Sequence, residues 1–174
     1  MGLRKAEIDS IIYDLYRLQK LKPDNIKLWM NRYSSESVDQ LVKKLETTDE
    51  LDTAHVAICI LLGKKGTVKA KEGLGKVIAF GMIDAFDGRR VTCPRVSVTA
   101  KWVLQELGSP APQSLIDGLT YPSNYDQASL RSMADLVVKI GGAGTLQRLK
   151  KALKEEGDEK ICRRLEIIIR RIEY

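Results

Sequence analysis

The chain has 174 residues, of which 44% are hydrophobic, 30% are charged and only 6% are aromatic. This composition is typical of a folded globular protein and excludes a disordered chain. Lysine and arginine (29) outnumber aspartate and glutamate (23), which gives a net charge of +6. The excess is concentrated in residues 63–105, with nine basic and three acidic side chains, so a negatively charged partner has to be considered.

Several classes of site are excluded by the residue types that are missing or scattered. Cys59, Cys93 and Cys162 form no Cys-x-x-Cys pair and no disulfide framework, which favours a reducing, cytoplasmic location. His55 is the only histidine, so a histidine-based metal cluster or catalytic triad cannot be assembled. The longest purely apolar run, 56–62, is far shorter than the roughly 20 residues of a membrane span, and we expect no membrane partner.

Apolar residues recur with a helical period along almost the whole chain. The pattern predicts ten helices. The first spans about 4–21, a short second one carries residues 26–30, and the third carries the stripe at 38–45. The others span about 52–62, 68–85, 94–107, 113–121, 124–140, 145–156 and 158–174. Ser34 or Ser35 is expected to cap the third helix, and Ser123 or Asn124 the eighth. Gly63 is expected to end the fourth.

The fifth predicted helix is the least regular. It contains Gly73, Gly75 and Gly81, each of which weakens a helix interior. Asp84 and Asp87 are three residues apart, a spacing that on a helix places them on one face, where they could hold a cation. The arginines at 89 and 90 more simply neutralise them.

The second half of the chain resembles a HEAT-like repeat. Residues 128–153 contain small residues in one helix, an exit at Ile140-Gly141, and Leu146-x-x-Leu149-x-x-Ala-Leu in the next helix. Asp158, followed by Ile161 and an arginine at 163 or 164, resembles the acidic turn and the second-helix arginine of such repeats.

This resemblance implies an all-α fold, an α-solenoid of about four HEAT-like helical hairpins plus an N-terminal helix pair. Residues 1–174 would form one domain, with the helix pair at 1–33, degenerate repeats at 34–109 and clearer repeats at 110–174. Second helices would line a concave binding surface, because each repeat buries its apolar face against its neighbours. The spacing of the repeats changes around 81–94, where we expect a stacking irregularity.

The predicted partner-binding residues lie mainly in the last helix. One face of this helix carries the apolar residues that are expected to face the core. The opposite face carries five cationic residues and one isoleucine: Lys160, Arg163, Arg164, Ile167, Arg170 and Arg171. A second pair, Arg95 and Trp102, shares one face of the sixth helix and could stack on a partner. For the last helix a simply solvated cationic face is the alternative. For Trp102 the alternative is a buried contact between helices.

These patterns favour a non-catalytic protein-interaction scaffold that binds a partner with an acidic surface. The alternative is a nucleic-acid-binding protein that uses the basic faces of 63–105 and 143–174. No catalytic, cofactor-binding or metal-binding residue is predicted. Association of the chain into a homo-oligomer is kept as an alternative.

Overall fold

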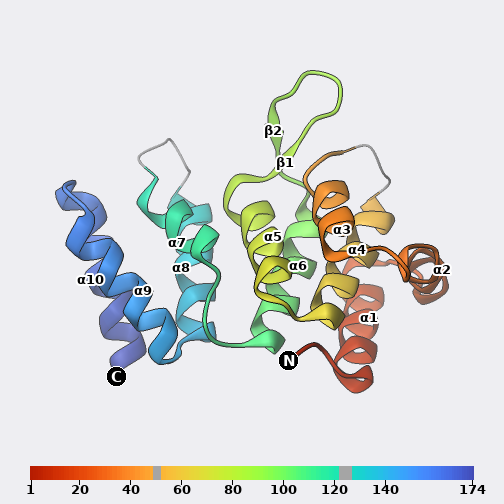
Figure 1. The fold of residues 1–174 in the computed structure, drawn as a ribbon, viewed down its shortest axis with the longest axis horizontal. Coiled ribbons are helices and arrows are strands. Elements are labelled where there is room, and N and C mark those ends of the chain that lie inside the picture. Colours follow the sequence, from red (N-terminus) through yellow and green to blue (C-terminus); the bar gives the residue numbers. More distant parts are fainter. Residues whose placement is uncertain (49–51, 122–126) are drawn as a thin grey trace. The chain divides into compact units, whose positions relative to one another are not determined.

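In the computed structural model, which describes residues 1–48, 52–121 and 127–174, the protein is all-helical (Figure 1). Helix accounts for 76% of the described residues, in ten helices. The prediction of an all-α fold is therefore confirmed. None of the described helices is long and apolar enough to cross a membrane.

The chain divides into two compact units, residues 1–107 and residues 108–174. The first unit contains α1 (Lys5–Gln19), α2 (Pro23–Tyr33), α3 (Val38–Leu45), α4 (Asp52–Lys65), α5 (Val68–Phe80), β1 (Met82–Ile83), β2 (Arg90–Val91) and α6 (Pro94–Leu107). The second contains α7 (Gln113–Thr120), α8 (Gln127–Ile140), α9 (Gly142–Glu155) and α10 (Glu159–Glu173).

Helix α4 is the centre of the first unit. Its residues from Ala54 to Gly63 are all buried, and it packs against α2, α3, α5 and α6. A helix that is apolar on every side has to be covered on every side. The predicted end at Gly63 is wrong by two residues, because α4 continues to Lys65.

Helix α3 begins later than predicted, and its cap is complete. Ser37 accepts a hydrogen bond from the backbone N–H of Gln40 at 3.2 Å, and the Gln40 side chain accepts one from the Ser37 N–H at 2.8 Å. This reciprocal arrangement satisfies two of the backbone donors that a helix start leaves open. Ser34 instead lies at the end of α2, where its hydroxyl donates to the Asn31 carbonyl at 2.8 Å.

The fifth helix is shorter than predicted, since α5 ends at Phe80 and not near residue 85. Gly81 has a φ of 72°, a conformation that glycine adopts at little cost, and the chain leaves the helix there. Met82 and Ile83 then pair antiparallel with Val91 and Arg90. This β1–β2 hairpin lies within the segment 81–94 where an irregularity was expected.

The second unit has its own core, formed by the inner faces of its four helices. Its buried apolar side chains include Leu115, Ile116, Leu119, Leu136, Val137, Leu149, Leu165 and Ile168. Thr145, predicted to start the ninth helix, lies inside α9, and its hydroxyl accepts a hydrogen bond from the Ala111 N–H at 2.9 Å. The predicted cap at Ser123 or Asn124 lies outside the described residues.

Candidate functional site

Helix α10 carries the predicted division between a core stripe and a cationic face. Asp158 caps it by accepting from the backbone N–H groups of Lys160 at 2.8 Å and Ile161 at 3.1 Å. Ile161, Leu165, Ile168 and Ile169 are buried in the core of the second unit. On the opposite face the side chain of Ile167 is 59% exposed.

Two of the predicted arginines have a structural role in the second unit. Arg164 donates from Nη1 to the carbonyl of Leu119 at 2.5 Å, which ties α10 to the end of α7. Arg171 pairs with Asp135 of α8 at 2.9 Å between Nη2 and Oδ1. Both guanidinium groups are therefore occupied within the unit.

The other cations of this face point into solvent. Lys160 and Arg170 are exposed and, among the described residues, their side chains make no ion pair. Arg163 contacts Glu159 at 3.1 Å, but both side chains are at least 75% exposed, and such a pair contributes little stability. We call Lys160, Arg163, Ile167 and Arg170 the α10 face.

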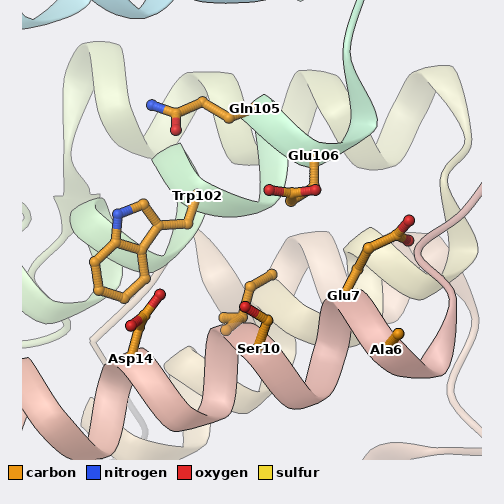
Figure 2. A pocket seen from close by; sticks show the side chains of 8 residues that line it. Ala6, Glu7, Ser10, Asp14, Trp102, Gln105 and Glu106 are labelled. Carbon is orange, nitrogen blue, oxygen red and sulfur yellow. The ribbon is translucent and has the colours of Figure 1, made fainter.

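Trp102 lies between two helices, as in the second of its two sequence-based interpretations. The indole is half-buried beside α1, at a pocket of about 420 Å³ that α1 and α6 line together. Figure 2 shows the ring of Trp102 directly above the carboxylate of Asp14, with Gln105 pointing away. Arg95 is exposed in the first turn of α6 and does not line this pocket, so the structure does not bring the predicted pair together in one site.

The pocket is acidic. Glu7 and Asp14 of α1 and Glu106 of α6 line it together with Trp102. The guanidinium of Arg4 donates to Glu7, and this hydrogen bond lowers the pKa of the Glu7 carboxyl and raises that of Arg4. The carboxylates beside Trp102 disfavour the approach of a phosphate backbone to this ring.

His55 and Cys59, two chemically reactive side chains of the first unit, are both buried. His55 is buried, and its Nε2 lies 2.7 Å from the carbonyl of Thr47 and 3.2 Å from that of Lys44, so it donates to these backbone oxygens. Burial raises the pKa of the Cys59 thiol far above its ordinary value. Within the described ranges no three histidine, cysteine or acidic side chains gather in a group that could hold a metal ion.

The sequence analysis missed the β1–β2 hairpin and the residue at its tip, Phe86, which is 98% exposed. Asp84 and Asp87 lie in this turn and not on a helix, and Asp87 pairs with Arg89 at 3.5 Å. The signal that could have revealed the hairpin is the dipeptide Asp87-Gly88, which is typical of tight turns between strands. The apolar period of the preceding helix obscured it.

No family model, curated protein or solved structure matches this chain. The resemblance to HEAT-like repeats therefore stays a prediction.

Proposed function

We propose that this protein is a non-catalytic, cytoplasmic interaction scaffold of HEAT-like helical hairpins, which binds a protein partner with an acidic surface through the α10 face. The observation that carries the proposal is Ile167, an isoleucine that is 59% exposed and lies among three exposed cations of the same helix. The all-helical fold with short connections is compatible with such a scaffold.

The chemistry of the α10 face suits an acidic protein surface. A small apolar centre surrounded by arginine is typical of the residues that dominate binding energy in interfaces. Guanidinium groups form paired hydrogen bonds with carboxylates, and Arg163 and Arg170 lie seven residues apart, two turns along the same face. The partner would therefore offer an apolar contact for Ile167 between carboxylates for the two arginines.

The test reverses the charge of the α10 face without disturbing the second unit. The variant combines Lys160→Glu, Arg163→Glu and Arg170→Glu, and it leaves Arg164 and Arg171 in place because they bond to Leu119 and Asp135. We expect the partner recovered with the wild-type protein in an affinity pull-down to be lost.

A matched control separates a specific surface from net charge. Lys5→Glu, Lys27→Glu and Lys64→Glu change the charge by the same amount at exposed positions of the first unit. The control variant should retain the partner. If both variants retain it, or both lose it equally, the α10 face is not the binding surface.

Ionic strength distinguishes the alternative function. Binding to nucleic acid would weaken steeply with salt, because log affinity falls by about 0.9 per neutralised phosphate for each unit of log salt concentration. Part of the basic excess of 63–105 is already paired within the first unit, since Lys69 contacts Asp39 at 2.7 Å and Lys76 contacts Glu46 at 3.3 Å. We therefore expect a shallow salt dependence.

A further inference from the structure

The pocket between α1 and α6 combines an indole ring with carboxylates. Its volume of about 420 Å³ lies within the range of about 300–1,000 Å³ that is usual for ligand sites. Besides Trp102 and three carboxylic acids, its described lining consists of two polar residues and two apolar ones: Ser10, Gln105, Ala6 and Ile11. Every charged group in this lining is negative, so the pocket suits a cation.

Two arginines near the pocket compensate only part of its negative charge. Arg4 donates to Glu7, which is the main cause of its raised pKa, and Glu106 makes the smallest contribution. Arg17 contacts Asp14 at 3.5 Å between Nη2 and Oδ1, and both side chains are partly exposed, so this pair is loose. Glu106 is exposed and makes no ion pair among the described residues. Three carboxylates beside two arginines leave one negative charge for a cation from outside.

The ring of Trp102 is open to such a cation, in contrast to the other tryptophan of the unit. In α2 the guanidinium of Arg32 lies 4.8 Å from the ring centroid of Trp29, a cation–π contact that the chain itself supplies. Within the described ranges no cation lies over the half-buried ring of Trp102. Figure 2 shows the carboxylate of Asp14 directly below this ring, and Glu106 follows one turn along α6. A cation stacked on the indole is therefore placed beside two carboxylates.

A guanidinium group matches this arrangement better than an ammonium group. Its flat face stacks on an aromatic ring while the N–H groups at its edge donate to carboxylates, whereas an ammonium is a compact point charge. Free arginine also carries a carboxylate, which the negative lining repels, and none of the described lining residues is basic enough to receive it. An arginine side chain within a protein segment brings the guanidinium without that carboxylate.

We propose that the pocket between α1 and α6 binds an arginine side chain of a protein partner, with the guanidinium stacked on Trp102 and hydrogen-bonded to Asp14 and Glu106. This inference goes beyond the proposed function. It uses a surface of the first unit and the opposite charge, since the α10 face requires carboxylates on its partner and this pocket requires an arginine.

The test follows the two indole N–H signals of the isotope-labelled full-length chain by NMR, with Trp29→Phe to assign them. The probe is a capped arginine, N-acetyl-arginine methylamide. We expect the Trp102 signal to shift saturably, with a Kd on the order of millimolar because a single side chain offers few atoms for binding. The Trp29 signal should stay in place.

Three further probes define what the pocket recognises. N-acetyl-citrulline methylamide has the shape of the capped arginine without its charge, and it should cause no saturable shift of the Trp102 signal. N-acetyl-lysine methylamide keeps the charge without the planar group, and free arginine adds a carboxylate. Each of these two should have a Kd at least about threefold higher than that of the capped arginine.

A pair of matched variants tests the carboxylates. Asp14→Asn combined with Glu106→Gln removes two negative charges with little change of shape, and it should raise the Kd of the capped arginine at least about fivefold. Asp9→Asn combined with Asp24→Asn makes the same charge change at exposed positions outside the pocket, and its Kd should stay within about twofold. Both variants keep Trp102 as the reporter, and their backbone N–H signals verify the fold.

Four results would overturn the inference. These are no saturable shift of the Trp102 signal with the capped arginine, an equal shift with the citrulline analogue, a capped lysine or free arginine that binds at least as tightly, and equal Kd values for the two double variants. The α10 variant keeps the two proposals apart, because it should bind the capped arginine with the wild-type Kd. Failure of the arginine titration leaves the α10 face untouched, and a partner retained by the α10 variant leaves the pocket untouched.

Discussion

Gly63 lies in the last turn of α4, and a glycine within a helix destabilises it by up to about 1 kcal/mol relative to alanine. The tertiary structure explains why the position is small. A Cβ at this position would lie 2.6 Å from Cγ1 of Val103 and 2.7 Å from Cδ1 of Leu3, both closer than carbon atoms can approach. The glycine therefore allows α6 and the N-terminal segment to pack directly on α4.

We expect Gly63→Ala to destabilise the first unit by about 1–3 kcal/mol, because the overpacking exceeds the gain in helix propensity. The measurement is urea unfolding followed by tryptophan fluorescence, since both tryptophans, Trp29 and Trp102, belong to this unit. Lys64→Ala is the control, because the neighbouring position of the same helix is exposed. A Gly63→Ala protein as stable as the wild type would contradict the packing argument.

At the scale of elements, helix ends are decided by side chains that satisfy backbone donors. Ser37 and Gln40 form a reciprocal cap at the start of α3, although Ser34 and Ser35 are equally good capping residues by type. Composition alone does not choose among three serines within four positions. The choice depends on which of them has a glutamine or an acid three residues later.

Replacing the capping serine tests this assignment. Ser37→Ala should destabilise the first unit by about 1 kcal/mol, within the range of about 0.5–2 kcal/mol for a lost helix cap. Ser35→Ala, at an exposed position outside the helices, should change the free energy of unfolding by less than about 0.5 kcal/mol. Both values come from urea unfolding at the same pH. Equal effects of the two substitutions would rule out Ser37 as the cap.

At the scale of the molecule, the two compact units have separate cores. Leu149 of α9 is fully buried in the second unit, and Leu62 of α4 is fully buried in the first. Because each unit packs its own apolar faces, a defect in one core should act mainly on its own unit. The positions of the tryptophans make this testable, since fluorescence follows the first unit and circular dichroism follows the helices of both.

We expect Leu149→Ala to lower the unfolding midpoint seen by far-ultraviolet circular dichroism, because a cavity in a core costs about 2–5 kcal/mol. The midpoint seen by tryptophan fluorescence should stay at the wild-type value. Gly63→Ala should give the opposite pattern, with a clear shift in fluorescence. A common shift of both signals in Leu149→Ala would mean that the chain unfolds as one cooperative body.

The sequence by itself determined the helical class and most helix positions, because a period of 3.6 residues is a local property that each segment carries. The limits of α6 follow from Pro94 in the first turn and Gly108 after the last, and the structure agrees with both. The core stripe of α10 was also predicted, since Leu165 shares one face with three isoleucines, Ile161, Ile168 and Ile169. In these cases the deciding atoms lie within one helix or next to it.

Only the tertiary structure decided which surface residues are available to a partner. Arg164 and Arg171 belong to the cationic arc of α10, yet they bond to groups 45 and 36 positions earlier in the chain, at Leu119 and Asp135. Trp102 lies beside the carboxylate of Asp14 on α1, and Phe86 is exposed because the chain leaves α5 at Gly81. Each outcome depends on atoms brought together by packing between distant segments, and no local period encodes such contacts.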